Sequence, residues 1–386
     1  MKPTDHRYFW CVILALAIWQ PVFPQAAQRA RQPAVQAPTS ASLKKALEGK
    51  FYLGAALNSH QISGRDTAAW AVLKEHFNGI TAENVMKAGR IQPREGAFHF
   101  ELADRFVALG VKEGMHIHGH TLIWHSQAPR WFFTDSEGKR VSREVLIQRM
   151  KDHIFTVVGR YRGKVHSWDV VNEALLDDGS FRKSPFYEII GEDYIQLAFE
   201  FARQADPDAA LYYNDYSMAN PAKRAGVVSL VKRLQQAGAP IDGIGMQGHI
   251  GLSYPSLDEF EKSIVAFAGL GLVVMITELD LTVLPTPRHG GGAEISANFN
   301  YRGELDPYVN ELPETVALAA ARRYQDFFRL FLKHHERITR VTLWGINDGH
   351  SWRNHWPVRG RTDYPLLFDR NNNPKAAVEL ILSLTD

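Results

Sequence analysis

The sequence predicts an α/β fold that closes as a single (β/α)8 barrel of the TIM type. Short apolar runs alternate with longer segments of helical periodicity, as in parallel strands joined by crossover helices. There are eight such runs, and eight strands close a barrel of this kind. Polar and aromatic residues follow nearly every run, at the end where active sites form in these barrels. The expected strands are 51–58, 77–82, 115–124, 165–172, 210–215, 244–249, 272–279 and 341–344.

Helical periodicity occupies the segments between these runs. An open, doubly wound sheet would alternate strands and helices in the same way and is the structural alternative. No glycine-rich dinucleotide turn follows the first strand, which counts against that alternative. The expected helices are 101–113, 143–160, 192–204, 223–237, 257–269 and 314–335.

The N-terminus has the pattern of a secretory signal peptide, which we assign to residues 1–27. Lys2 and Arg7 precede the apolar run 8–19, and small residues follow at 26–27. The run is short for a membrane span, and a retained membrane anchor is the alternative. We therefore expect a secreted or periplasmic protein with no membrane attachment after signal cleavage.

One catalytic domain, 43–386, is expected after a flexible linker at 28–42 that is rich in Gln, Ala, Pro and Ser. The single cysteine, Cys11, lies in the signal segment, so the mature chain would hold no disulfide and no thiolate metal site. The connection 284–313 follows the seventh strand. A loop of this length on the active face of a barrel is often functional.

The composition favours a neutral or weakly charged binding partner. The formal net charge is +2, which gives no reason to expect nucleic acid or a membrane surface as a partner, and nothing implies a protein partner. The nine Trp and 13 Tyr suit a protein that binds sugars, because sugar rings lay apolar C–H faces on aromatic rings. Core packing explains the same counts, so the composition alone does not decide.

Two carboxylates stand at the ends of expected strands. Glu173 follows the fourth strand and Glu278 follows the seventh, so a barrel brings them to the same mouth. Paired carboxyl groups suit acid/base catalysis or glycoside hydrolysis. Each could instead cap a helix or pair with a Lys or Arg, but the neighbouring Asn172, Gln247 and His249 favour a site.

Three histidines alternate in the third strand, so His116, His118 and His120 are expected to share one face. Such a pattern can hold a divalent metal, although a packed or hydrogen-bonded histidine is commoner. Gly119 and the lack of carboxylates nearby in the sequence count against a metal. We therefore expect neither a metal nor a cofactor.

With these residues in view, the chain resembles the family 10 glycoside hydrolases, the barrel-type endo-β-1,4-xylanases. Six motifs occur in the order found in that family, over most of residues 43–386, and a lone Asn-Glu pair would not be specific. The motifs are 83–87, 119–127, 168–174, 247–249, 277–280 and 344–348.

The resemblance implies a role for each matching residue. Glu173 would be the acid/base and Glu278 the nucleophile, held by His249, which would pair with Asp280 behind it. Asn172 would bind the 2-hydroxyl of the sugar that is cleaved. Tyr216 would stack on the leaving-group side. The glycone side would be lined by Glu83, Asn84, Lys87, His120, Trp124, Gln127, Gln247, Trp344 and Trp352.

Two positions depart from the family pattern. Ala88 stands where many relatives carry a bulkier residue, and Ser217 stands where Asn is common. Together with the long 284–313 connection, these differences put local sugar contacts in doubt but leave the chemistry intact.

The resemblance implies endo-acting hydrolysis of xylan and xylo-oligosaccharides by a retaining double displacement. A cellulase or mannanase on a similar barrel is the alternative enzyme, and a carbohydrate-binding protein on an inactive barrel is the alternative without catalysis. Glu173 would need a raised pKa in order to donate a proton. We expect the negative charge of Glu278 to keep that proton in place.

Overall fold

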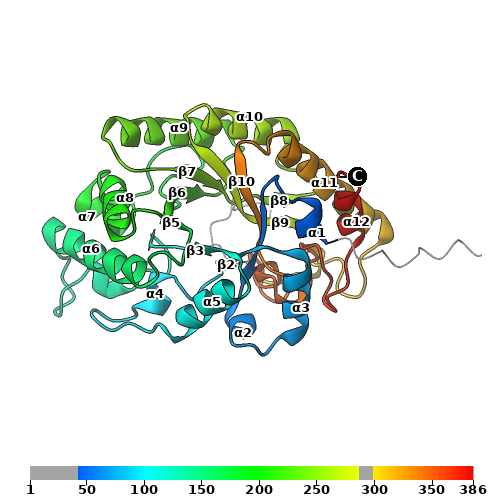
Figure 1. The fold of residues 1–386 in the computed structure, drawn as a ribbon, viewed down its shortest axis with the longest axis horizontal. Coiled ribbons are helices and arrows are strands. Elements are labelled where there is room, and N and C mark those ends of the chain that lie inside the picture. The colour runs from blue at the N-terminus through cyan, green and yellow to red at the C-terminus, as the bar shows by residue number, and fades with distance from the viewer. Residues whose placement is uncertain (1–41, 287–298, 386) are drawn as a thin grey trace, which may run out of the picture. The chain divides into compact units, whose positions relative to one another are not determined.

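The structure is a computed structural model that describes residues 42–286 and 299–385, so the expected signal peptide and almost all of the linker lie outside the described residues. Eight strands pair in parallel around a closed barrel, because β10 pairs with both β9 and β1 (Figure 1). This confirms the predicted (β/α)8 fold. The strands are β1 (Tyr52–Leu57), β2 (Gly79–Ala82), β3 (His116–Gly119), β5 (Ser167–Asn172), β6 (Ala210–Asp215), β7 (Gly243–Met246), β9 (Val273–Thr282) and β10 (Ile338–Leu343).

Helices surround the barrel on its outer side (Figure 1). The six predicted helices are present, each with ends within a few residues of the expectation, whereas α3 and α12 were not predicted from the sequence. The helices are α1 (Leu43–Ala46), α2 (Ser59–Ile62), α3 (Thr67–His76), α4 (Ala88–Ile91), α5 (Glu101–Lys112), α6 (Arg143–Arg160), α7 (Pro185–Ile190), α8 (Tyr194–Ala205), α9 (Pro221–Gln236), α10 (Leu257–Ala268), α11 (Glu314–Lys333) and α12 (Ala376–Leu382).

Local sequence explains where several of these helices begin. The side chains of Ser142 and Ser256 accept backbone N–H groups at the starts of α6 and α10. Asn220 does the same for α9, and Pro221 then occupies the first helical position, where no N–H is needed. These caps fix the first residues of three helices that follow the loops of the active face.

Two short strands extend the barrel at its carboxyl end. β4 (Ile123–Trp124) pairs with β5, and β8 (His249–Gly251) pairs with the end of β9. The predicted strand 115–124 is therefore two strands with a break between them. Likewise β9 continues to Thr282 because β8 provides it with a second partner. Both additions position side chains at the mouth of the barrel.

The inside of the barrel is packed with side chains, some of them polar. Trp168 on β5 is fully buried, and Gly119 on β3 makes room for its ring. Lower in the barrel, the guanidinium of Arg340 donates to the hydroxyls of Thr81 and Thr342. The buried guanidinium of Arg340 is thus paired with hydroxyl groups, as burial requires.

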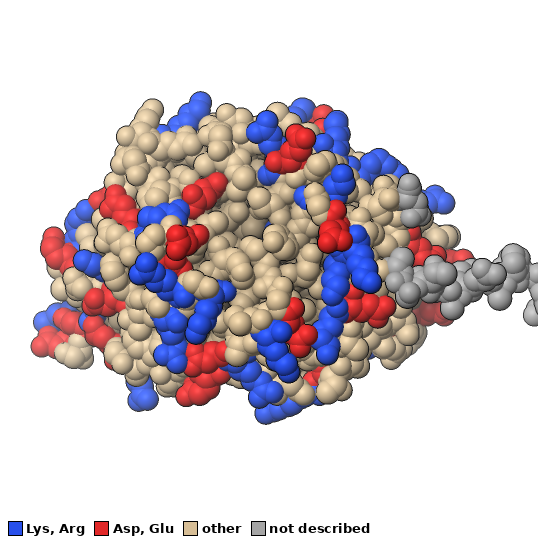
Figure 2. Space-filling view, in the orientation of Figure 1, with Lys and Arg blue, Asp and Glu red and all other residues tan. Residues whose placement is uncertain are grey.

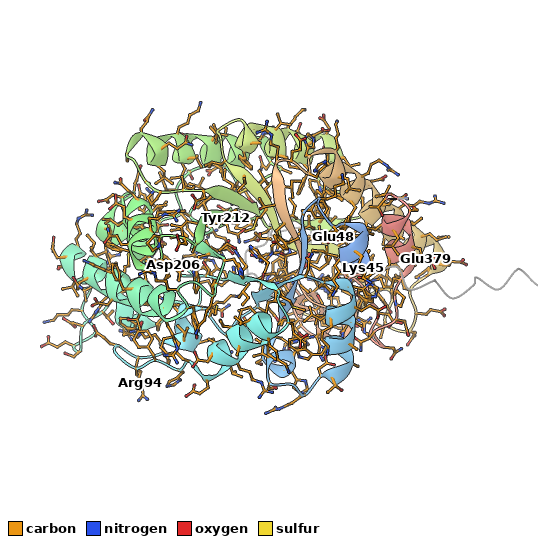
Figure 3. All side chains as sticks on the ribbon, in the orientation of Figure 1. Lys45, Glu48, Arg94, Asp206, Tyr212 and Glu379 are labelled. Carbon is orange, nitrogen blue, oxygen red and sulfur yellow. The ribbon has the colours of Figure 1, made fainter. Side chains whose placement is uncertain are left out.

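The described surface carries mixed charge. Lys and Arg side chains alternate with Asp and Glu over the face in Figure 2. Lys45 of α1, Glu48 just after α1, and Asp206 before β6 are labelled in the same view in Figure 3. Within the described ranges, no helix has the length and apolar character needed to cross a membrane.

Gly119→Ala should destabilise the protein by about 1–3 kcal/mol, the usual cost of overpacking a core. An added Cβ would lie 2.1 Å from Cε3 of Trp168, a ring that is fully buried and has no space to move. Thermal unfolding followed by circular dichroism measures the effect.

Gly159→Ala is the matched control, because a Cβ there meets nothing within 4 Å on the exposed side of α6. Its greater helix propensity should keep or raise the melting temperature. Equal melting temperatures for the two variants would contradict the close packing of β3 against Trp168.

Candidate active site

Glu173 and Glu278 lie at the carboxyl ends of β5 and β9, and their side chains are almost completely buried. The carboxyl group of Glu173 is held by two neutral donors. Trp124 Nε1 donates to Oε2 at 2.8 Å, and Gln247 Nε2 donates to Oε1 at 2.8 Å. Both donors come from the strand ends beside β5 and β6, so the barrel itself sets the orientation of this carboxyl group.

The backbone at Glu173 is in the left-handed region, with φ of 60°. A residue with a side chain adopts this conformation at a cost, and such residues cluster at functional sites. Three hydrogen bonds hold it here. The N–H of Glu173 donates to the carbonyl of Asn214 at 2.9 Å, its carbonyl accepts from Arg182 Nε at 3.1 Å, and the N–H of Ala174 donates to Tyr213 Oη at 3.2 Å.

Glu278 has different surroundings. Asn214 Nδ2 donates to Oε1 at 2.9 Å, and His249 Nε2 lies 3.3 Å from Oε2. The opposite nitrogen of His249, Nδ1, lies 2.9 Å from Oδ1 of Asp280. The histidine is therefore fixed between two carboxylates, as the resemblance implied for Glu278, His249 and Asp280.

Asp280 is the charged anchor of this chain of contacts. It is fully buried and accepts hydrogen bonds from Trp352 Nε1 at 2.6 Å and from the guanidinium of Arg353 at 3.0 Å. Burial opposes its charge, but Arg353 and His249 together lower its pKa to about 2. Burial also disfavours a charged His249, but Asp280 and the hydrogen bond to Glu278 raise the pKa of His249 to about 9. A positive charge thus faces Glu278 at neutral pH.

The pKa of Glu173 is raised to about 7. Burial is the largest cause, the negative charge of Asp215 is the next to raise it, and Glu278 raises it less. The hydrogen bonds from Gln247 and Trp124 act in the opposite direction. The sequence led us to expect that Glu278 keeps the proton on Glu173. Glu278 acts in the expected direction, but burial and the charge of Asp215 contribute more.

A cavity of about 770 Å³ surrounds the two glutamates. It brings together all the residues that were predicted for the glycone side, although they come from strand ends and loops that are far apart in the sequence. Asn58, His350 and Trp356, which were not predicted, line it as well. The predicted residues in its wall are Glu83, Asn84, Lys87, His120, Trp124, Gln127, Asn172, Gln247, His249, Trp344 and Trp352.

Several of these side chains are linked to one another. Lys87 Nζ donates to Asn84 at 3.0 Å, and Asn84 Nδ2 donates to Glu83 at 3.2 Å. The Lys87 ammonium also lies 4.8 Å from the centre of the Trp124 ring. Burial raises the pKa of Glu83 and lowers that of Lys87. Alternating donors and acceptors of this kind match the hydroxyl groups of a sugar.

The three histidines of β3 have separate roles. His118 and His120 both contact Oδ2 of Asp169, at 3.0 and 2.8 Å, and His116 stacks on His166 with ring centres 4.7 Å apart. Asp169 is 49 residues from His120, so this carboxylate partner could not be predicted from the sequence. In the part of the chain that the structure describes, no group of His, Cys, Asp and Glu is arranged to hold a metal.

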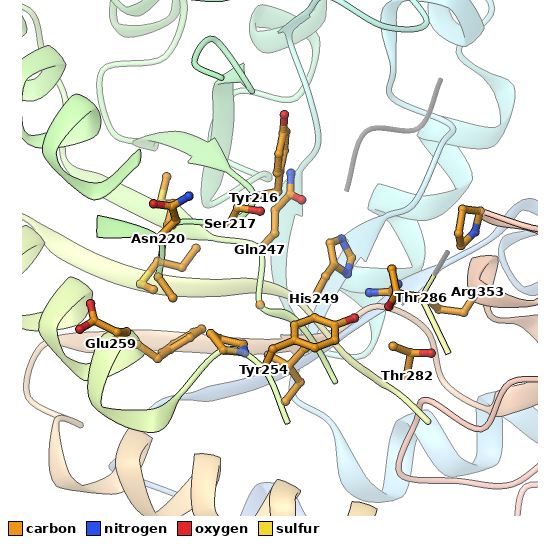
Figure 4. A pocket seen from close by; sticks show the side chains of 18 of the residues that line it. Tyr216, Ser217, Asn220, Gln247, His249, Tyr254, Glu259, Thr282, Thr286 and Arg353 are labelled. Carbon is orange, nitrogen blue, oxygen red and sulfur yellow. The ribbon is translucent and has the colours of Figure 1, made fainter. Parts of the chain in front are cut away.

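A second cavity, of about 520 Å³, begins at Gln247 and His249 and extends towards Tyr254 (Figure 4). Tyr216 lies in its wall, and its Oη accepts from Arg182 Nη2 at 2.7 Å. The two cavities share Gln247, His249 and Trp356, so they form one cleft on both sides of the glutamates. The first three residues of the long connection 284–313 line this cavity. Residues 287–298 of the connection lie outside the described residues.

Sequence reasoning missed three residues that hold the site together. Asn214 binds Glu278 and also Asn172, at 2.9 Å each. Trp356 stacks on Trp352 with ring centres 4.7 Å apart, and Arg353 supports Asp280. Asn214 stands in a polar strand end that the sequence does display, but only the fold shows which way its side chain points.

A barrel whose mouth holds two buried carboxyl groups in different electrostatic surroundings, within a cleft of amides and tryptophans, defines the class of the barrel glycosidases. The comparisons with known proteins place the chain within that class. A sequence model of glycosyl hydrolase family 10 matches residues 42–384. The chain belongs to this family.

Similar proteins cover nearly the whole chain. The endo-1,4-beta-xylanase A of Xylanibacter ruminicola is 52% identical over 343 residues, which is 89% of this chain and 93% of that protein. The endo-1,4-beta-xylanase of Geobacillus stearothermophilus is 43% identical over 350 residues, 89% and 98% of the two chains. A GH10 endoxylanase from a sugarcane soil metagenome has a solved structure with a TM-score of 0.87 and 45% identity, covering 89% of this chain and 100% of its own.

Asp280→Asn should lower the pKa of His249 well below its wild-type value of about 9, because the Asp280 charge that opposes the effect of burial is lost. Histidine ring signals followed by NMR over a pH titration measure this shift, with His249→Gln used to assign the signal. In the wild type, His249 should stabilise the fold fully below pH 6.5, and this stabilisation should be lost as the pH rises to about 9. An unchanged titration in Asp280→Asn would contradict the role of Asp280.

Proposed function

We propose that this protein hydrolyses internal β-1,4 bonds of xylan with retention of configuration, with Glu278 as nucleophile and Glu173 as acid/base. The observation that carries the proposal is the difference between the two carboxyl groups. Glu173, with a pKa of about 7, keeps a proton near neutral pH. Glu278 instead faces the imidazole of His249 and accepts a hydrogen bond from Asn214.

In the first displacement, an oxygen of Glu278 forms a bond to the anomeric carbon while the bond from that carbon to the leaving oxygen breaks. Glu173 gives its proton to the leaving oxygen. The hydrogen bonds from Trp124 and Gln247 hold the Glu173 carboxyl in one orientation during this transfer. The sugar is left joined to Glu278 as an ester.

In the second displacement, water attacks the anomeric carbon and gives its proton to Glu173, and the bond to Glu278 breaks. Esterification removes the charge of Glu278, which lowers the pKa of Glu173 and suits it to act as base.

The glycone-side residues are proposed to bind the xylan chain. The linked Glu83, Asn84 and Lys87 present donors and acceptors to sugar hydroxyls. Asn172, fixed by its contact with Asn214, is placed to meet the 2-hydroxyl of the cleaved sugar. The remaining members of this set are His120, Trp124, Gln127, Gln247, Trp344 and Trp352.

The leaving-group side is proposed to lie along the second cavity. Tyr216 is held there by Arg182, and Lys223 Nζ lies 3.6 Å from the centre of its ring. A ring fixed in this way provides a flat surface for a sugar. Residues 1–27 are further proposed to direct secretion before they are removed, which would bring the enzyme to its polymeric substrate.

Activity should be much greater on soluble xylan and xylo-oligosaccharides than on cellulose derivatives and cello-oligosaccharides. Glucose units carry a hydroxymethyl group at C5 that xylose lacks, and Trp344 and Trp352 in the cavity wall should crowd it. Reducing-sugar release from the two polymers, followed by product analysis, measures the preference. Equal rates on the two polymers would favour a cellulase. Trp352→Ala should make the rates on xylan and on cellulose derivatives more similar.

Replacement of the two glutamates separates their roles. Glu278→Ala should abolish hydrolysis of every substrate, because no ester can form. Glu173→Ala should abolish hydrolysis of xylan, but it should still form the ester from an aryl xylobioside with a good leaving group, giving a burst and slow turnover. Added azide should speed that turnover and yield a β-glycosyl azide, because a small anion needs no base.

The stereochemistry of the azide product decides the assignment. If azide instead restores turnover of Glu278→Ala and yields a β-azide, the two roles are exchanged, because a product with retained configuration then requires Glu173 to form the ester. Full activity in both variants would exclude catalysis by this pair, and binding of xylo-oligosaccharides without hydrolysis by the wild type would favour a binding protein.

A further inference from the structure

A buried cluster of three residues lies beside the acid/base and has no part in the two displacements. We call Tyr213, Asp215 and Lys223 the Asp215 cluster. All three are fully buried, although two of them are charged. Lys223 Nζ on α9 lies 2.7 Å from Oδ1 of Asp215 on β6, and Tyr213 Oη donates to Oδ2 of the same carboxylate.

The cluster holds the chain on the carboxyl side of Glu173. Tyr213 Oη accepts the N–H of Ala174 at 3.2 Å, and Lys223 Nζ donates to the carbonyl of Leu175 at 3.0 Å. Both residues that follow Glu173 are therefore tied to side chains that Asp215 orients. This is the point at which the chain must support a left-handed backbone.

We propose that Asp215 is a positioning residue of the reaction: its carboxylate organises the side chains that anchor the Glu173 backbone, and its negative charge faces the Glu173 carboxyl. The inference rests on the proposed role of Glu173. It adds a second function to a buried ion pair that would otherwise be only structural.

The hydrogen bonding of the cluster is complete. Asp215 accepts from Lys223, from Tyr213 and from the backbone N–H of Tyr216 at 2.9 Å. Lys223 donates to Asp215 and Leu175 and lies over the Tyr216 ring. A buried ion pair of this kind adds little net stability compared with well-packed apolar residues. A benefit to stability alone therefore does not account for the two charges.

The charges that face Glu173 come from several elements. Asp215 projects from β6, Glu278 from β9, and His125 Nδ1 lies 4.0 Å from Oε2. Burial lowers the pKa of Lys87, and Glu173 is one of three nearby carboxylates that oppose this shift. After burial, Asp215 contributes most to the raised pKa of Glu173.

Asp215 must be ionised in order to act in this way. Burial and the neighbouring Glu173 disfavour its charge, and burial raises its own pKa. The ammonium of Lys223 and the hydrogen bonds from Tyr213 and the Tyr216 N–H favour the ionised form. Burial raises the pKa of Tyr194 on α8, and the nearby Asp215 carboxylate raises it further. Lys223 therefore serves to keep Asp215 charged.

The test is the pH dependence of kcat/KM for xylan in Asp215→Asn. Loss of the negative charge makes ionisation of Glu173 easier, so the basic limb should move to lower pH by about one unit. The rate of ester formation from an aryl xylobioside with a good leaving group should change much less, because that step needs no proton from Glu173. An unmoved basic limb would overturn the proposal.

Asp348→Asn is the matched control. Asp348 is also fully buried and paired with a lysine, since Lys375 Nζ lies 3.1 Å from its Oδ2. The Asp348→Asn variant should have a lower melting temperature, but the basic limb of its pH profile of kcat/KM should not move. An equal shift of the limb in both variants would overturn the proposal, because it would show a general effect of disturbing buried pairs.

Tyr213→Phe tests the anchoring separately from the charge. It removes the hydroxyl that accepts from Ala174 but keeps the carboxylate, so kcat on xylan should fall about tenfold through misplacement of Glu173. If Asp215→Asn does not fold, the double variant Asp215→Asn/Lys223→Gln leaves no unpaired charge, and its basic limb should again lie below that of the wild type.

Azide treatment of Glu173→Ala distinguishes an error in the role of Asp215 from an error in the role of Glu173. A β-glycosyl azide from Glu173→Ala together with an unmoved limb in Asp215→Asn would reject the role of Asp215 alone. Absence of the azide product would reject the role of Glu173, and the inference with it.

Discussion

The burial of two carboxyl groups at the mouth of one barrel is the constraint on which the rest of this structure depends. Ionised groups are costly to bury unless they are paired or hydrogen-bonded. Glu173 and Glu278 are both almost fully buried, so each needs partners chosen for the state in which it works. Neutral donors serve Glu173, whereas a charged histidine serves Glu278. The supporting residues of the site can be understood as consequences of this requirement.

Each partner needs a partner of its own, and the barrel provides them strand by strand. His249 is fixed by Asp280, and Asp280 by Trp352 and Arg353. The side chain of Asn214 points towards Glu278 because Thr277 Oγ1 donates to its amide oxygen, Oδ1, at 2.6 Å. Neighbouring strands in a barrel place such side chains at fixed heights, so a rigid sheet can hold several linked polar groups in one arrangement.

The sequence predicts the parts of this arrangement that depend on strand ends. Glu173 and Glu278 could be selected because each directly follows an apolar run, and the barrel rule brings such ends together. Asp169 could not be selected, since it lies inside its strand and its histidine partners are distant in the sequence. Asp215 stands at a strand end, but only the fold shows that it is buried beside Glu173. The break between β3 and β4 was also missed, because Leu122 and Ile123 continue the apolar pattern through it.

The same limit explains why the sequence pointed to Glu278 as a cause of the raised Glu173 pKa but not to the larger contribution of Asp215. In the sequence, Glu278 is the evident second charge, and the lysine eight positions after Asp215 resembles a simple structural partner. The fold reveals that Asp215 is buried beside Glu173 while His249 partly balances the charge of Glu278. Glu278 loses its charge when it is esterified, whereas Asp215 is not esterified, and both carboxylates act on Glu173. The first adjusts Glu173 between the two displacements, and the second raises its pKa.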